Sequence, residues 1–84
     1  MKIRKYEIEK VTIVLPGGDL VYEGTKDLDI YLGTVADASP CVLLDLVNTK
    51  YLSAKAIGLI TFYVKHFREK HGGLKLIHVN NNLK

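Results

Sequence analysis

Residues 41–59 read CVLLDLVNTKYLSAKAIGL, and this stretch decides the fold. Its first part, CVLLDL at 41–46, is apolar except for Asp45 and lies between Pro40 and Asn48. Such a run is typical of a buried strand, either covered on both faces or set in the middle of a sheet. The second part has helical spacing, so the stretch predicts a strand, a loop and a helix. We expect function in the loop, because binding sites often follow the carboxyl ends of parallel strands.

The N-terminal segment shows the alternation of a half-buried strand. Apolar residues alternate with polar ones at Tyr6 and Ile8 and again from Val11 to Leu15, and PGG at 16–18 ends the pattern. The dipeptide at 9–10 contains none of the usual turn residues. A tight hairpin and one long bent strand therefore both remain open.

Two amphipathic helices are predicted. The first has Thr25 as its N-cap, an apolar stripe, and an end before the Ser-Pro pair at 39–40. The second begins near Ser53, whose hydroxyl can cap it, and runs to about Lys70, where HGG at 71–73 supplies a glycine for the left-handed stop. The predicted buried stripes are Leu28, Tyr31, Leu32 and Val35 in the first helix, and Ala56, Leu59, Ile60, Tyr63, Val64 and Phe67 in the second.

A last strand alternates at Leu74, Leu76 and Val79 and ends in NNN at 80–82. The element order is strand, strand, helix, strand, helix, strand (β-β-α-β-α-β). Joining parallel strands through right-handed helical crossovers gives an α/β fold with a single mixed four-stranded sheet backed by helices. With 84 residues, we expect one domain over 1–84.

Composition restricts the setting of the chain. Cys41 is the single cysteine, which rules out an internal disulfide; we expect it to be a buried small hydrophobe in a reducing compartment. The N-terminus lacks the apolar core of a signal peptide, and no apolar run has membrane-spanning length. These features predict a cytoplasmic protein without membrane insertion.

Charge is unevenly distributed along the chain. From Lys50 onward there are seven Lys or Arg against one acid, whereas the preceding part has five bases and eight acids. A basic half can bind an anionic partner, although a solvated basic helix face is the commoner explanation. Nucleic-acid binding is disfavoured, because no aromatic platform or recognisable motif accompanies the basic positions.

The sequence gives little support for catalysis. The histidines lack metal-ligand spacing, and no glycine-rich phosphate loop occurs. Thr49 and Ser53 have no identifiable base, since we expect Asp45 to be structural or to cap the loop. We predict a protein that is not an enzyme and has no catalytic residue, metal site or cofactor.

The element order and four segments together resemble a STAS domain of the anti-sigma factor antagonist (anti-anti-sigma factor) type. The segments are GDL at 18–20, LDL at 44–46, YLSAKAIGL at 51–59 and GGLKL at 72–76, and the likeness spans about residues 6–80. The resemblance implies a bacterial, non-catalytic protein-interaction module in transcription regulation that docks through the loop and helix start at about 48–58. Its partner would be a protein, with an anti-sigma factor kinase as the candidate. The implied partner-binding residues are Asn48, Thr49, Ser53, Ala54, Lys55 and Gly58.

This sequence departs from the family pattern at the switch. Alignment places Ser53 at the loop aspartate, Ala54 at the first serine and Lys55 at the serine that cognate kinases phosphorylate. A lysine cannot accept phosphate, so the switch would be absent or moved to Ser53 or Thr49. A cation at a helix N-terminus also opposes the helix dipole.

A second departure concerns the C-terminus. The family continues past the fourth strand with a further helix on the sheet, whereas this sequence ends at Lys84 and is shortened there. A bare apolar surface usually marks an interaction site, so the resemblance suggests a homodimer or a larger complex.

Two alternatives remain open. One is a small-ligand or nucleotide-binding STAS domain that uses backbone amides at the helix start, with Lys55 as counter-charge for phosphate. The other is a STAS scaffold subunit of a larger complex, such as a lipid-transport or stressosome-like assembly.

Overall fold

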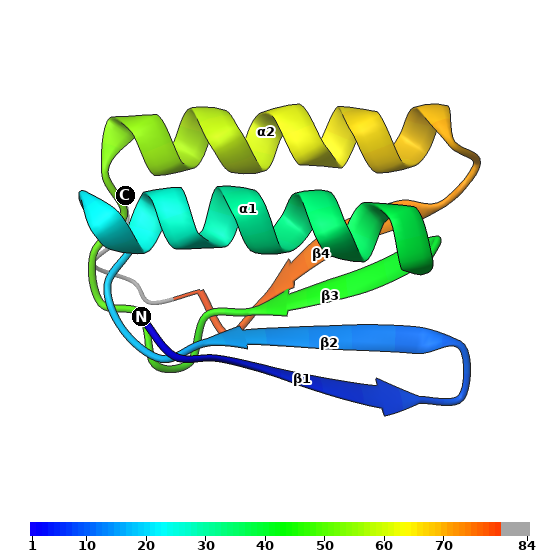
Figure 1. The fold of residues 1–84 in the computed structure, drawn as a ribbon, viewed down its shortest axis with the longest axis horizontal. Coiled ribbons are helices and arrows are strands. Elements are labelled where there is room, and N and C mark those ends of the chain that lie inside the picture. Colours follow the sequence, from blue (N-terminus) through cyan, green and yellow to red (C-terminus); the bar gives the residue numbers. More distant parts are fainter. Residues whose placement is uncertain (80–84) are drawn as a thin grey trace.

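The computed structural model describes residues 1–79, and it confirms the predicted order of elements (Figure 1). The predicted end of the last strand at 80–82 lies outside the described residues. The elements are β1 (Ile3–Ile8), β2 (Val11–Pro16), α1 (Glu23–Ala38), β3 (Cys41–Asp45), α2 (Ala54–Glu69) and β4 (Gly73–Ile77).

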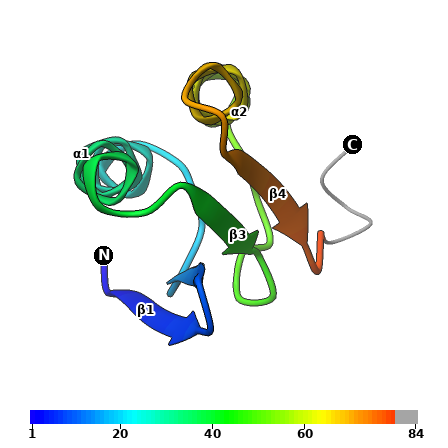
Figure 2. The same cartoon turned by 90° about the vertical axis from the view of Figure 1, so that its right-hand side faces the viewer.

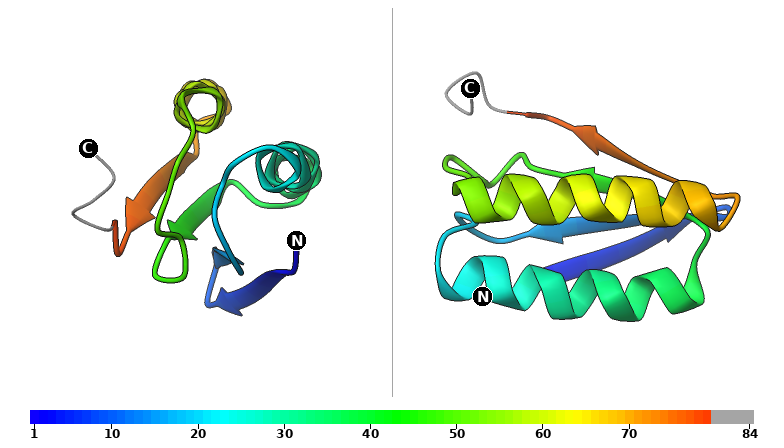
Figure 3. Two further views of the ribbon diagram at one scale, coloured as in Figure 1. Left: turned by 90° about the vertical axis from the view of Figure 1, so that its left-hand side faces the viewer. Right: turned by 90° about the horizontal axis from the view of Figure 1, so that it is seen from above.

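The four strands form one mixed sheet in the order β1-β2-β3-β4. β1 is antiparallel to β2, and β2, β3 and β4 are parallel to one another. Two right-handed crossovers that proceed in the same direction across a sheet place their helices on the same face. Accordingly, α1 and α2 lie side by side on one face, and the opposite face carries no helix among residues 1–79 (Figures 2 and 3).

β1 and β2 form a tight hairpin, which settles the alternative left open by the sequence. Their register runs from Ile3 opposite Pro16 to Ile8 opposite Val11, so Glu9 and Lys10 form a two-residue loop. Glu9 adopts a φ of 59°, a conformation that the sequence did not signal because glycine or asparagine usually provides it. The prediction that the first run is half-buried is wrong for most of β1, since this edge strand leaves Ile8 60% exposed.

β3 is a central strand, which is one of the two alternatives that the sequence left open, and helices cover only one of its faces (Figure 2). Val42 and Leu44 are buried beneath the helices, whereas Leu43 is half-buried on the other face. Cys41 is exposed, so the expectation that it is a buried hydrophobe is wrong. The reason is geometric, because alternation along the strand turns Cys41 and Leu43 toward the face without helices.

The core lies between the sheet and the two helices. Both predicted helical stripes face it; Tyr31, Leu59 and Val64 are half-buried and the other members are buried. The buried apolar residues are Val14, Leu20, Leu28, Leu32, Val35, Ala36, Val42, Leu44, Leu46, Ala56, Ile60, Tyr63, Phe67 and Leu74. Neither α1 nor α2 combines the length and apolarity needed to cross a bilayer, and no other helix occurs among the described residues.

The helix ends differ in part from the predictions. α1 begins at Glu23, with Tyr22 at the N-cap position, so the prediction of Thr25 as the cap is wrong. Thr25 instead lies buried inside the helix, where its hydroxyl faces α2. After α2, His71 adopts the left-handed conformation that we had expected from a glycine. Gly72 is required for a different reason, because a Cβ there would overlap the carbonyl oxygen of Pro40.

Candidate functional site

Two loops are joined into one unit at the carboxyl ends of β2 and β3. The chain after β2 runs beside the chain before α2, and Leu20 and Leu52 form a parallel bridge. The amide of Leu20 donates to the carbonyl of Tyr51 at 3.0 Å, and the amide of Ser53 donates to the carbonyl of Leu20 at 3.0 Å. The carboxylate of Asp19 accepts the amides of Lys50 and Tyr51 at 2.8 and 3.2 Å. The loop where we expected function is thus held to the preceding loop by two main-chain hydrogen bonds and by two hydrogen bonds to the Asp19 carboxylate.

Side-chain hydrogen bonds of Thr49 and Asp45 also fix the loop. The hydroxyl of Thr49, which is fully buried, donates to the carbonyl of Gly18 at 2.9 Å. The carboxylate of Asp45 accepts the amide of Val47 at 3.1 Å and lies 2.8 Å from Nδ1 of His78. Asp45 therefore caps the loop, as the sequence predicted. Thr49 supports the loop from below and is not accessible to a partner or a kinase in this structure.

Ser53 caps α2, which confirms the predicted helix start. Its Oγ accepts the amide of Ala56 at 3.0 Å, and the hydroxyl of Thr25 on α1 lies 3.4 Å from the same oxygen. The Ser53 side chain is half-buried. Its hydroxyl is therefore occupied by the helix start, and its neighbour across the helices is a second hydroxyl.

The first two turns of α2 present an accessible surface. Ala54, Lys55 and Gly58 are exposed, and a Cβ at Gly58 would meet nothing within 4 Å. Ile57 is 49% exposed beside them. Asn48 is exposed further along, where it lines a hollow of about 270 Å³ with Lys2 and Arg4 at its rim.

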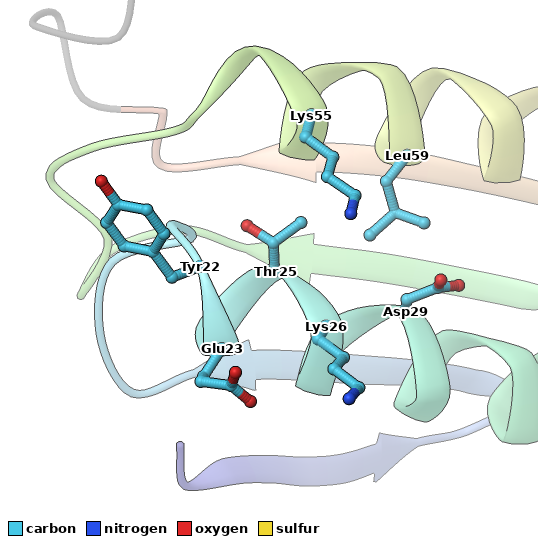
Figure 4. Close-up of a pocket in the computed structure, with 7 residues that line it drawn as sticks. All are labelled: Tyr22, Glu23, Thr25, Lys26, Asp29, Lys55 and Leu59. Atoms are coloured by element: carbon cyan, nitrogen blue, oxygen red, sulfur yellow. The ribbon is translucent and has the colours of Figure 1, made fainter.

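A hollow of about 480 Å³ lies between the N-terminal turns of α1 and α2 (Figure 4). Lys55 and Leu59 extend from α2 toward α1, from which Thr25 points back (Figure 4). The residues that line the hollow are Tyr22, Glu23, Thr25, Lys26, Asp29, Lys55 and Leu59. Two ammonium groups and two carboxylates line the same hollow, so its formal charge is balanced.

Large side chains are exposed around this hollow and the joined loops. Tyr22 is 90% exposed, and its backbone has a φ of 49° at the start of α1. Tyr51 is 61% exposed and Val47 is 57% exposed in the neighbouring loop. We call the surface formed by Tyr22, Val47, Asn48, Tyr51, Ala54, Lys55, Ile57 and Gly58 the docking end. Exposed aromatic and aliphatic side chains on a rigid backbone are typical of protein-binding surfaces.

Tyr63 connects the two helices behind the hollow. Its hydroxyl donates to the main-chain carbonyl of Asp29 and to the carboxylate of Asp29, each at 3.1 Å. Burial raises the pKa of Tyr63 above its ordinary value, and the hydrogen bond and the charge of Asp29 raise it further. The phenol thus stays neutral and fixes the spacing of α1 and α2.

The structure brings together most of the residues that the sequence singled out. Ser53, Ala54, Lys55 and Gly58 lie at the start of α2, and Asn48 lies in the adjoining turn. Asp19 and the α1 residues were missed, although Asp19 stands in the GDL segment that carried the resemblance. Nothing in the sequence pattern indicated the exposure of Tyr22. No group of three or more His, Cys, Asp or Glu within residues 1–79 could hold a metal ion.

Comparisons with known proteins show what the architecture is similar to. An anti-sigma factor antagonist of Thermotoga maritima, tm1081, superposes with a TM-score of 0.88 at 16% identity over 96% of this chain and 71% of that one. The anti-sigma factor antagonist SpoIIAA in its unphosphorylated form gives a TM-score of 0.77 at 10% identity over 94% and 74% of the two chains. A structure described as Mglu gives 0.79 at 11% identity, with 96% of this chain covering 20% of that one. No family model and no curated protein matches the sequence.

Proposed function

We propose that this chain, which has the STAS fold of the anti-sigma factor antagonists, is a non-catalytic protein-interaction module that docks through its docking end. The centre of this surface is the loop and helix start at about 48–58. The two solved antagonists suggest a partner of the anti-sigma factor class. We extend this to a partner of the kinase type, as the sequence resemblance implies.

The exposure of large side chains on a rigid support is the observation that carries the proposal. Tyr22, Tyr51 and Ile57 are between 49% and 90% exposed, yet the loops beneath them are joined by the Asp19 and Leu20 hydrogen bonds. Little backbone entropy is lost when such a surface binds, because its backbone is already ordered. Aromatic anchors also contribute more to protein interfaces than most residue types.

The hydroxyl groups at this surface favour binding over catalysis. A serine nucleophile needs a base within hydrogen-bond reach. The Ser53 Oγ instead accepts the amide of Ala56, and its other neighbour is the Thr25 hydroxyl. Ser53 therefore serves the helix, and the same commitment makes it a poor acceptor for phosphate.

Lys55 gives the surface a fixed charge. Its side chain is exposed in the first turn of α2 and reaches toward α1 (Figure 4). A serine at this position could gain about −1.5 to −2 charges on phosphorylation, whereas a lysine keeps one positive charge. We propose that docking is not switched by phosphorylation at position 55.

Nucleotide or small-ligand binding is a second candidate, favoured by the hollow of about 480 Å³ and its two lysines. The carboxylates of Glu23 and Asp29 line the same hollow, however, and would repel phosphate oxygens. This balance favours a protein partner over a nucleotide. A scaffold role in a larger complex would use the same docking end and differs only in the partner.

The test compares aspartate substitutions at two exposed helix positions. Ile57→Asp places a carboxylate in the docking end, whereas Thr34→Asp places one on an exposed position of α1 near its opposite end. Affinity capture from the native host with each tagged variant, followed by titration of the purified captured protein, measures docking. We expect Ile57→Asp to weaken binding roughly tenfold or more and Thr34→Asp to leave it unchanged.

Equal binding by both variants would place the partner elsewhere on the chain. A parallel thermal-shift series with millimolar ATP and GTP separates the second candidate. Stabilisation that disappears in Lys55→Ala would favour the nucleotide, whereas no stabilisation supports the protein partner.

A further inference from the structure

The face of the sheet that carries no helix among residues 1–79 is a second accessible surface of the chain (Figure 2). Alternation along each strand assigns residues to it, because side chains directly opposite in neighbouring strands share a face. The register places Tyr6 beside Ile13, Ile13 beside Leu43, and Leu43 beside Lys75. The residues on this face, which we call the open face, are Arg4, Tyr6, Ile8, Val11, Ile13, Leu15, Cys41, Leu43, Asp45, Gly73, Lys75 and Ile77.

The centre of the open face is apolar. Val11, Ile13 and Leu15 of β2 are half-buried, as is Leu43 of β3, and no helix among residues 1–79 covers them (Figure 2). Their partial burial comes from one another and from the strands. A contiguous apolar surface of this kind usually marks an interaction site.

A hollow of about 190 Å³ indents the open face. Its lining residues are Val11, Cys41, Val42, Leu43, Gly73 and Lys75. The hollow exists because Gly73 has no side chain, and a Cβ placed there would meet nothing within 4 Å. One apolar side chain of a partner can enter at this point.

The charged groups of the open face that are free to pair with a partner are both positive. Arg4 lies on β1 and Lys75 on β4, so each outer strand carries a cation. No carboxylate among residues 1–79 lies within 4 Å of either cation. The single carboxylate of this face, Asp45, already accepts the amide of Val47 and lies 2.8 Å from Nδ1 of His78.

This charge pattern disfavours a second copy as the occupant. Aligned packing of two such faces about a two-fold axis places outer strands over outer strands. The outer strands that carry Arg4 and Lys75 in one copy would then lie over the outer strands that carry them in the other, and like charges at an interface are unfavourable.

We propose that the open face binds an amphipathic α-helix of a partner protein, with acidic residues flanking the apolar stripe of that helix. Apolar anchors at i, i+3 or i+4 and i+7 lie over β2 and β3, and one of them enters the hollow at Gly73. Carboxylates on the flanks of the helix pair with Arg4 and Lys75. This surface lies on the other side of the sheet from α1 and α2, and it adjoins the docking end only at the hollow that Arg4 and Leu15 share with Asn48.

Two synthetic helical peptides test the proposal on the intact chain. They share one leucine stripe, and their flanking positions are all glutamate in one and all lysine in the other. Amide NMR shifts locate the peptide on the chain, and fluorescence anisotropy measures affinity. We expect the glutamate peptide to bind and to shift the amides of Ile13, Leu43 and Lys75, and the lysine peptide to bind more weakly.

Two substitutions sharpen the result. Lys75→Glu should weaken the binding of the glutamate peptide roughly two- to fivefold and strengthen the binding of the lysine peptide, because one flanking ion pair is reversed. Gly73→Val places a side chain in the hollow, where a Cβ meets nothing within 4 Å, and should weaken the binding of both peptides roughly tenfold or more. Lys65→Glu on the exposed part of α2 is the matched charge control and should change neither affinity.

Three results would overturn the proposal. The glutamate peptide could fail to bind at millimolar concentration, or its shifts could map to residues 48–58. Light scattering could also show a dimer, and amide NMR shifts that change with protein concentration could map to the open face. These two results together would make a second copy the occupant.

Discussion

The carboxylate of Asp19 accepts the main-chain amide of Lys50 at 2.8 Å and so joins the loop after β2 to the loop before α2. The same oxygen accepts the amide of Tyr51 at 3.2 Å. One side chain thus orders the backbone on which the docking end is built. Because these amides have no other protein acceptor among the described hydrogen bonds, removal of the carboxylate leaves them to water.

Asp19→Ala should lower the free energy of unfolding by about 1–2 kcal/mol, because two hydrogen bonds to a charged acceptor are lost. Urea denaturation measures the change. Asp37→Ala is the control, since Asp37 is 84% exposed and its only ion pair within residues 1–79, to Lys70, is 3.7 Å long. It should change the stability by less than about 0.5 kcal/mol. Equal effects of the two substitutions would contradict the role of Asp19.

The N-cap of α2 gives a second prediction. Ser53→Ala removes the acceptor for the Ala56 amide and should cost about 1 kcal/mol of stability. Ser53→Asp keeps an acceptor and adds a negative charge at the positive end of the helix, so it should be more stable than Ser53→Ala. Thr61→Ala, at an exposed position within the helix, serves as control in the same denaturation series. An alanine at 53 that is as stable as serine would show that the cap is not formed.

The interhelical hydrogen bond of Tyr63 predicts a pH dependence. Burial first, and then Asp29, raise the pKa of Tyr63 above the ordinary value of about 10. The unfolded chain therefore loses this proton at lower pH than the folded chain does. The stabilisation is complete below about pH 10 and is lost as the pH rises through the raised value.

Tyr63→Phe tests that dependence. At neutral pH the substitution should cost about 0.5–1.5 kcal/mol, because the hydrogen bond to Asp29 is lost. Chemical denaturation along an alkaline pH series should then show the two proteins converging in stability above about pH 10. A constant difference across the series would mean that the phenol does not titrate differently on folding.

The sequence predicted those parts of the fold that depend on local spacing. Leu28, Leu32 and Val35 recur at helical intervals and are buried, and Ser53 stands directly before the second helical pattern and caps it. The resemblance to a STAS domain also anticipated the architecture and the start of α2 as the candidate site. The helical stripes and the cap need only the residues of one element, whereas the architecture was anticipated from segments spread along the chain.

The remaining features depend on contacts between elements that are distant in sequence, and the spacing of residues within one element does not encode such contacts. Cys41 lies in an apolar run, yet it is exposed because both helices pack on the other face. Thr25 has the chemistry of a cap, but it faces Ser53 across the helices while α1 begins earlier. Tyr22 joined the site only through the contact of two loops that are distant in sequence.

Two glycines at opposite ends of α2 form a matched pair for the last prediction. Gly58 lies in the helix, where an added Cβ meets nothing within 4 Å. Gly58→Ala should therefore raise the free energy of unfolding by about 0.5–1 kcal/mol, because alanine loses less backbone entropy on forming a helix.

Gly72 follows α2, and a Cβ there would overlap the carbonyl oxygen of Pro40, the residue that precedes β3. Gly72→Ala should cost about 1–3 kcal/mol, because the chain segments around Pro40 and Gly72 must separate. Thermal and urea denaturation of both variants measure the two changes. If Gly72→Ala left the stability unchanged, Gly72 and the carbonyl of Pro40 would not lie in close contact at the starts of β4 and β3. The pairing of Cys41 with Gly73 would then be contradicted.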